Sequence, residues 1–392
     1  MNLKKVFFVL LSFILSESLI YSQSTTNDLP IIDISKKYPT KEIILQDIAD
    51  VEYVSLETTD DVLMCGVSLS DVSILFHVSD KYICTFELIR GEIFIFNRGG
   101  KIVHHFNHKG QSGQEYTDIK SVIFDEENEE IFVCTYSESI LVFSMSGEFK
   151  RKLQSIKNYE AYNFDDKTLL VFDNIDIEAV NTTSKKYPYR FISKKEGSTV
   201  DVLDINLPKR YSPSFLVEPG HSIRIGTLDQ KYFGKDLVIA DISSDTLYLL
   251  TQNKELTPIL VRKPSVHASE PRIVWANNLM TDKFILIKFI TLDFKSKSGK
   301  IESTLLMYEF ETGEISVVSI KNADYINSAI SGWSPGNGAL SYTIAKNMTA
   351  ELVYIPRLKE QASKKIFSKK FEKFVAKLDE DDNPIVRITT FK

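Results

Sequence analysis

Short apolar runs alternate with polar or glycine-containing turns along most of this chain. The clearest run is Ile93–Phe96, which is followed by Gly99-Gly100 and then by the apolar pair Ile102-Val103. Short runs rich in Ile, Val and Phe and bounded by glycine are typical of β-strands that are joined by tight turns. The pattern therefore predicts a chain built largely from β-hairpins.

This hairpin occurs a second time, 47 positions further along the chain. There Ile140–Phe143 precedes a turn that closes at Gly147, and Glu148–Lys150 begins the next strand. A period of about 40 to 50 residues in β-rich sequence is typical of propeller blades. We therefore expect an all-β protein, a six-bladed β-propeller of four-stranded antiparallel blades.

The same alternation gives limits for the blades. The first two are expected to cover Ser70–Asn107 and Ile119–Leu153, each with four strands. The later blades are expected to begin at or near Tyr159, Ser214, Arg272 and Tyr325.

The C-terminal part departs from the β pattern. Apolar residues between Arg357 and Leu378 fall at helical spacing among many lysines, which predicts one amphipathic helix over about residues 357–379. Pro384 prevents the helix from continuing. Ile385–Phe391 alternates again, and we expect this strand (about 385–391) to pair with an N-terminal strand and close the ring.

The N-terminus has the pattern of a targeting segment. Lys4 and Lys5 precede the apolar stretch Val6–Leu15, and small residues follow at Ser22 and Ser24. We therefore expect residues 1–24 to be a secretory signal peptide and residues 25–392 to form a single propeller domain. No cysteine near the expected cleavage region could serve as a lipobox cysteine, so we expect an exported protein, periplasmic or extracellular.

Charge and cysteine content narrow the class further. The formal net charge is -6, and removal of residues 1–24 would make it -7. An acidic chain does not fit a nucleic-acid partner, which requires a basic face. The three cysteines, Cys65, Cys84 and Cys134, cannot all pair with one another, so no disulfide framework is expected.

Four segments of the chain resemble one family of bacterial proteins. Gly110–Tyr116 resembles its glycine-rich loop between blades, and Phe143–Phe149 resembles its repeated hairpin. Val54–Asp61 resembles its opening strand and turn, and Asp382–Ile385 with Phe391-Lys392 resembles its terminal strand. The family is the exported six-bladed β-propeller family of gut-type bacteria, an NHL-like or TolB-like ring whose function is largely unassigned.

The resemblance implies the propeller fold and an exported location, and it implies no catalytic residue. The chain departs from the family's Gly-x-Gly-Pro-x-Glu-Tyr loop at Ser112 and Gly113. It also lacks the lipobox cysteine of many members, which favours release over anchoring.

Histidines are concentrated in one short segment, since His104, His105 and His108 are half of the six in the chain. On a single strand His104 and His108 would share a face, about 13 Å apart. That separation is too large for the pair alone to chelate a metal ion. We therefore expect no cofactor, with a calcium or zinc site as the alternative, and we take His104 and His108 as candidate binding residues at a blade edge.

Two loops supply the other candidate binding residues. Glu115 and Tyr116 follow the glycine loop and are candidates on one rim of the channel; alternatively Tyr116 packs between blades while Glu115 caps a turn. Trp333 and Asn337 lie in the turn-rich segment Ser331–Gly338, where an aromatic ring could stack on a sugar or anchor a protein partner. The alternative there is a Trp333 buried between blades.

No motif for a serine nucleophile, a phosphate-binding loop or a His-Glu-x-x-His metal site occurs in the sequence. Propellers commonly bind through loops at one face. We therefore predict a non-enzymatic exported binding or scaffolding module that recognises a protein or glycan partner in the cell envelope. The alternative is a propeller lyase or lactonase with a metal ion in the channel. Membrane contact through the basic helix is not expected, and no oligomeric state is predicted.

Overall fold

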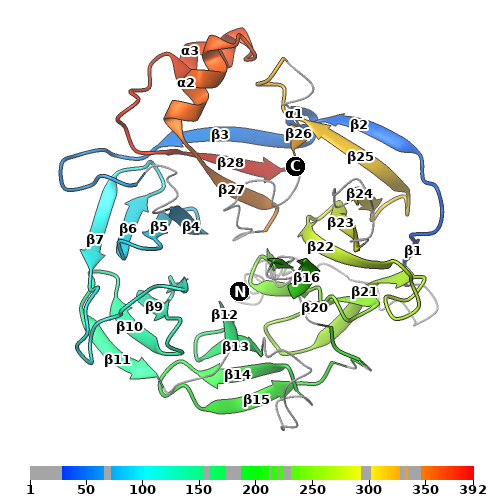
Figure 1. Cartoon of the computed structure of the whole chain (residues 1–392), viewed down its shortest axis with the longest axis horizontal. Helices are drawn as coiled ribbons and strands as arrows, with labels where there is room; N and C mark the ends of the chain where they lie inside the picture. Colours follow the sequence, from blue (N-terminus) through cyan, green and yellow to red (C-terminus); the bar gives the residue numbers. More distant parts are fainter. Residues whose placement is uncertain are drawn as a thin grey trace, which may run out of the picture.

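A computed structural model of the chain describes residues 29–65, 72–153, 159–173, 187–205, 207, 209–211, 214–218, 221–224, 231–292, 302–326, 332–333 and 346–392. The expected signal peptide, residues 1–24, lies outside these ranges. Six blades of antiparallel strands surround a central axis, as Figure 1 shows. The prediction of a six-bladed propeller with four-stranded antiparallel blades is confirmed.

The first three blades follow the chain without interruption, each with its strands in sequence order from the channel to the rim. Their strands are β4 (Ser73–Val78), β5 (Tyr82–Glu87), β6 (Glu92–Asn97) and β7 (Ile102–Asn107); β8 (Ser121–Asp125), β9 (Glu130–Cys134), β10 (Ile140–Ser144) and β11 (Phe149–Leu153); and β12 (Tyr159–Asn163), β13 (Thr168–Asp173), β14 (Tyr189–Ser193) and β15 (Thr199–Leu203). The limits expected for the first two blades agree closely with these strands.

The last three blades are formed by the second half of the chain together with strands from its N-terminal part. Their strands are β18 (Lys231–Phe233), β19 (Asp236–Ile239), β20 (Thr246–Leu250) and β21 (Leu256–Lys263); β22 (Arg272–Met280), β23 (Phe284–Leu292), β24 (Glu302–Glu309) and β25 (Ile315–Lys321); and, among the described residues of the sixth blade, β27 (Met348–Val353), β28 (Ile385–Phe391) and β3 (Ala49–Ser55). The two-residue strand β26 (Gly332–Trp333) pairs with β25.

The repeated hairpin of the sequence corresponds to a repeated packing contact. In β6–β7 and β10–β11 the register shifts by one residue at the same place, just before the turn. Gly100 and Gly147 close these turns with φ of +82° and +90°, values that favour glycine. A Cβ on Gly147 would lie 2.6 Å from the ring of Phe106 in the preceding blade, and one on Gly100 would collide with the carbonyl oxygen of Ser55. The outer strand of each preceding blade therefore packs directly on these glycines.

The ring is closed by the C-terminal strand, as expected. β28 pairs antiparallel with β27 on one side and with β3 on the other, from Ile385 opposite Ser55 to Phe391 opposite Ala49. The sixth blade therefore contains strands from the two ends of the chain, which leaves no open gap between first and last blades.

The N-terminal segment continues around the rim beyond this blade. β1 (Ile31–Asp33) adds a parallel strand to β21, and β2 (Thr40–Ile44) adds a parallel strand to β25. The short helix α1 (Leu45–Ile48) then leads into β3. We call residues Ile31–Ser55 the N-terminal strap, because this segment follows the outer edges of three successive blades (Figure 1).

The single C-terminal helix of the prediction is wrong, because the segment forms two short helices. α2 spans Ile355–Ser363 and α3 spans Lys369–Val375. Between them Phe367 forms a bridge with Tyr325, and Ser368 caps α3 by accepting from the backbone N–H of Phe371. The side chains of Phe367 and Phe371 are buried against the propeller. The ring centres of Phe371 and Tyr53, a residue of the outer strand β3, lie 4.7 Å apart. The apolar side of this segment is therefore covered by the propeller.

The expected start of the fourth blade near Ser214 is also wrong. β16 (Ser214–Glu218) and β17 (His221–Arg224) form a separate two-stranded hairpin, and the inner strand of the blade is β18. In Figure 1 this hairpin projects onto the opening inside the ring. The alternation of apolar residues predicts a strand at this position but does not show which sheet the strand joins.

Candidate functional site: the loop face

The two faces of the ring differ in the connections that they carry. In each complete antiparallel blade the first strand turns into the second at one face, and the second connects to the third at the opposite face. We call these the turn face and the loop face. The chain enters the first strand of each blade from the loop face, so the long blade-to-blade connections lead there. The connection that contains α2 and α3 enters β28 at Ile385, opposite Ser55 at the loop-face end of the outer strand β3, and the helices lie beyond the rim there (Figure 1).

Ion pairs join the turns of the turn face across blade boundaries. The carboxylate of Glu126, in the second blade, lies 3.0 Å from Nε2 of His77 and 3.4 Å from Nζ of Lys81, both in the first blade. Glu127 pairs with Lys235 of the fourth blade. Elsewhere on the same face, the ammonium of Lys346 lies 2.7 Å from the carboxylate of Asp282.

The best-buried of these carboxylates belongs to Glu126. The hydrogen bond from His77, followed by smaller contributions from Ser79 and Lys81, lowers the pKa of Glu126 to about 2 against the opposing effect of burial. Ion pairs therefore link the turns of this face to one another.

Exposed apolar side chains have a different distribution. Among the described residues, eight large hydrophobic side chains are exposed, and none of the eight lies in a turn of the turn face. Leu63, Ile89, Tyr136 and Ile326 belong to connections of the loop face. Ile31, Val103, Val200 and Val202 lie in strands at the rim.

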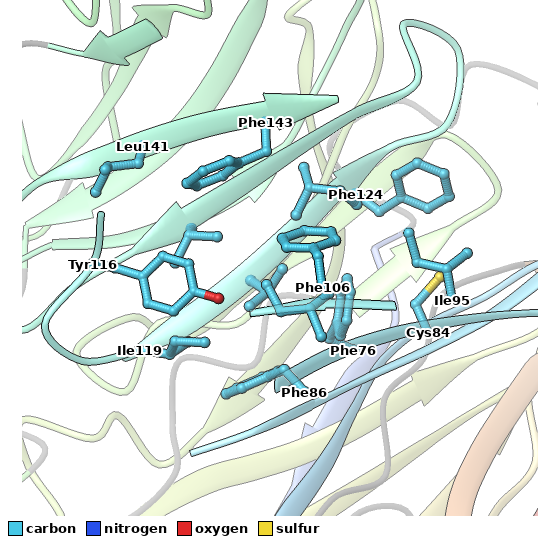
Figure 2. Packing of buried hydrophobic residues seen from close by; sticks show 14 residues of the cluster. Phe76, Cys84, Phe86, Ile95, Phe106, Tyr116, Ile119, Phe124, Leu141 and Phe143 are labelled. Carbon is cyan, nitrogen blue, oxygen red and sulfur yellow. The ribbon is translucent and has the colours of Figure 1, made fainter. Parts of the chain in front are cut away.

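Glu115 and Tyr116 make the structural contacts expected in the alternative, and a binding role for either residue stays a prediction. Tyr116 is buried, its hydroxyl donates to the carbonyl of Gly91 at 2.7 Å, and its ring lies among Phe106, Ile119 and Phe143 between the first two blades (Figure 2). The carboxylate of Glu115 accepts from the backbone N–H of Ser112 at 2.8 Å. This bond lowers the pKa of Glu115. Both residues hold the inter-blade loop in shape.

The structure does not bring His104 and His108 into one site. His104 lies on β7 opposite Ile95, whereas His108 follows the end of the strand. The imidazole of His108 stacks on Phe143 at 5.1 Å, and its Nε2 donates to the carbonyl of Gly147 at 2.6 Å. Among the described residues no group of three or more His, Cys, Asp or Glu side chains is arranged to hold a metal ion.

The second candidate loop falls mostly outside the described residues. Asn337 is one of those left out, and only the backbone of Trp333, in β26, is described. The other tryptophan, Trp275, is buried in β22 and donates its indole N–H to the carbonyl of Asp241 at 3.0 Å.

The structure reveals a cluster on the loop face that the sequence did not indicate, and we call it the Tyr211 cluster: Lys209, Tyr211, Ser243, His267 and Arg272. The guanidinium of Arg272 lies 3.6 Å from the centre of the Tyr211 ring, and the ammonium of Lys209 lies 5.4 Å from it. The backbone N–H of Tyr211 donates to the hydroxyl of Ser243 at 2.8 Å.

His267 fixes the hydroxyl end of the tyrosine. Its Nε2 donates to the carbonyl of Ser243 at 3.0 Å, and its Nδ1 lies 3.0 Å from the Tyr211 hydroxyl. Because the carbonyl of Ser243 can only accept, Nε2 carries the ring proton in this contact, and Nδ1 can then accept a hydrogen bond from the Tyr211 hydroxyl. The three connections that supply the cluster are far apart in sequence, so only the adjacent Lys209-Arg210-Tyr211 could have drawn attention to it.

Comparison with known proteins identifies the family of the chain. Residues 29–390 match a domain of unknown function, DUF4934. The chain belongs to the DUF4934 family. No curated protein matches this DUF4934 chain. The resemblance to a family of bacterial six-bladed propellers is thereby confirmed at the level of family and fold.

A solved structure resembles this DUF4934 protein in fold. A candidate exported protein from Bacteroides fragilis superposes with a TM-score of 0.62 at 13% identity, over 92% of this chain and 99% of that chain. A member of the DUF4221 family from Bacteroides vulgatus superposes with a TM-score of 0.49 at 10% identity, over 88% of this chain and 99% of that chain. The first likeness supports the propeller fold. Within the described ranges, no helix of the DUF4934 protein has the length and apolar content to cross a bilayer.

Proposed function

We propose that this DUF4934 protein is an exported, non-enzymatic binding or scaffolding module that recognises a protein or glycan partner in the cell envelope through its loop face. The observation that carries this proposal is the contrast between the faces. Ion pairs engage the turns of the turn face with one another, whereas the exposed Leu63, Ile89 and Tyr136 lie on the loop face. Exposed large apolar side chains on connections held by a rigid scaffold are typical of interaction surfaces.

Export is supported by two observations. Residues 1–24 have the charge and apolar pattern of a secretory signal peptide. The structurally similar protein from Bacteroides fragilis is itself described as a candidate exported protein. We propose the periplasm or the extracellular space as the compartment.

In-cell crosslinking with an amine-reactive reagent, followed by mass spectrometry of the tagged full chain, tests this function. Exposed lysines are available on both faces, Lys109 and Lys209 on the loop face and Lys81 and Lys167 on the turn face. The proposal predicts crosslinks to a dominant partner from Lys109 or Lys209. Partner crosslinks confined to Lys81 and Lys167 would contradict it.

A further inference from the structure

Two cations of the Tyr211 cluster have no carboxylate partner in the part of the chain that the structure describes. Lys209 and Arg272 both lie against the Tyr211 ring, and neither forms an ion pair with any described carboxylate. Lys81, Lys235 and Lys346 of the turn face, by contrast, each pair with a carboxylate. The loop face therefore presents two positive charges beside one aromatic ring.

The carboxylates on the same connections are directed elsewhere. Asp241 accepts from the backbone N–H of Ser243 at 2.8 Å and from the hydroxyl of Tyr189 at 3.1 Å. Asp245 accepts from the backbone N–H of Val266 at 2.6 Å. The exposed Asp204 and Glu270 also form no ion pair with the cluster. The acidic side chains that the structure describes on these connections thus form no ion pair with Lys209 or Arg272.

A buried guanidinium adds positive charge to the same connections. Arg262 is 2% exposed, and it donates to the carbonyl of Ile273, next to Arg272. Its nearest carboxylate contact, Asp245, is 3.9 Å away, and its Nη2 has no hydrogen-bond partner among the described residues. Burial lowers the pKa of Arg262 to about 10, so this guanidinium remains charged at neutral pH.

The side chains of the cluster indicate the kind of ligand. Arginine and lysine at one point favour a carboxylate or sulfate group, with Arg272 able to bind two of its oxygens. A protein partner would in addition require a large apolar anchor. None of the exposed large hydrophobic side chains of the described residues lies in the connections that form the cluster.

From this juxtaposition we infer that the Tyr211 cluster binds the anionic group of an acidic saccharide, with Arg272 and Lys209 holding a carboxylate or sulfate and Tyr211 fixing the position of both cations. The inference rests on the proposed function, because it names the ligand class of the same face. His267 and Ser243 serve to keep Tyr211 in place.

Binding of two probes to the full mature chain tests the inference: tetragalacturonate, which carries carboxylates, and a sulfated disaccharide. Saturable binding of at least one probe by calorimetry is expected, and binding should weaken as the salt concentration rises. Lys209→Gln with Arg272→Gln should weaken it by at least about tenfold. The matched control, Lys81→Gln with Lys167→Gln, removes two charges from the turn face and should leave binding unchanged. Lys209→Gln alone, at an exposed position, covers the case in which the double variant does not fold.

Two further probes distinguish an acidic saccharide from other anions. Tetragalacturonate with methyl-esterified carboxylates should not bind, and tetraglutamate should bind more weakly than the saccharides. Equal or tighter binding of tetraglutamate, equal binding by the loop-face and control variants, or no binding of either acidic saccharide would overturn the inference. In any of those cases, partner crosslinks from Lys109 would still uphold the proposed function, so the two can fail separately.

Discussion

Histidine side chains show how single residues connect the blades of this protein. His108 joins the first blade to the second through Phe143 and the carbonyl of Gly147. His77 lies edge-on to Phe124 at 5.0 Å and contacts Glu126 at 3.0 Å. Each of these imidazoles thus combines an aromatic contact with a polar one at a blade boundary. Both histidines therefore have a structural role in the described part of the chain.

The pair of Glu126 and His77 gives a prediction for acid stability. The pKa of Glu126 is about 2 in the folded protein, against an ordinary 4.5. As the pH falls, the unfolded chain binds the proton first, so this stabilisation is complete above about pH 4.5 and is lost as the pH approaches about 2. Because the side chain is partly exposed, we expect Glu126→Gln to lower the free energy of unfolding by only about 1 kcal/mol near neutral pH.

Urea unfolding at about pH 7 and about pH 3 measures this effect. The difference between Glu126→Gln and the unmodified protein should shrink at the lower pH. Glu311→Gln, which changes an exposed carboxylate in the β24–β25 turn, is the control and should have no effect at either pH. A difference for Glu126→Gln that is constant or that grows on acidification would contradict the assignment.

At the scale of elements, the repeated hairpin is a packing unit. Gly147 and Gly313 both have positive φ, of +90° and +69°, but only Gly147 lies against a neighbouring blade. The cost of a left-handed alanine is about 1 to 2 kcal/mol at either position. Gly147→Ala should cost about 1 to 3 kcal/mol more than Gly313→Ala, because its Cβ collides with Phe106.

Thermal and urea unfolding of the two glycine variants separates the contributions of strain and packing. Gly313→Ala reports the strain alone, since no atom lies within 4 Å of the point that its Cβ would occupy. Equal destabilisation by both substitutions would show that the contact between blades is not tight.

The N-terminal strap is the second element with a specific consequence. Ile32 and Ile31 are neighbours on β1, but Ile32 is 0% exposed and Ile31 is 51% exposed. Ile32 packs in a cluster with residues of the fourth and fifth blades, such as Val238 and Ile285. We expect Ile32→Ala to lower the free energy of unfolding by about 2 to 4 kcal/mol and Ile31→Ala by less than about 0.5 kcal/mol.

Chemical denaturation of the two isoleucine variants is the measurement. Similar small losses for both would mean that β1 is not part of the stable ring. A large loss for Ile32→Ala would show that the strap contributes to the core as well as to the sheet edge.

The elements that could be predicted from sequence are those with local signals. Alternation of apolar residues indicates the strands of the first two blades, and the C-terminal alternation indicates the ring-closing strand Ile385–Phe391. The parallel pairing of the strap could not be predicted, because Ile31–Asp33 and Thr40–Ile44 are short and their partners lie far along the chain. The break between α2 and α3 depends on the bridge of Phe367 to Tyr325, a tertiary contact that helical periodicity does not contain.

The candidate site was less accessible to sequence analysis than the fold. Glu115 and Tyr116 attract attention as a motif, but the sequence does not show that Glu115 bonds to Ser112 and Tyr116 to Gly91. The Tyr211 cluster has no motif, since it forms only when three connections meet at the loop face.

At the scale of the whole molecule, the two faces of the ring differ in the interactions that their side chains make. On the turn face, ion pairs join neighbouring turns, as between Glu126 and His77 and between Asp282 and Lys346. The loop face carries the long connections, exposed apolar side chains and the Tyr211 cluster. This difference is the reason for our proposal that binding takes place at the loop face.

Oriented immobilisation tests binding at the loop face most directly. A single reactive cysteine is introduced on either face of a Cys65→Ser background, in which the remaining Cys84 and Cys134 are buried. Lys167→Cys attaches the turn face to a surface, and Lys109→Cys attaches the loop face. Binding of the crosslinked partner and of tetragalacturonate is then measured on both surfaces. We expect binding when the protein is held through Lys167→Cys and loss of binding when it is held through Lys109→Cys; the reverse result would contradict a binding role for the loop face.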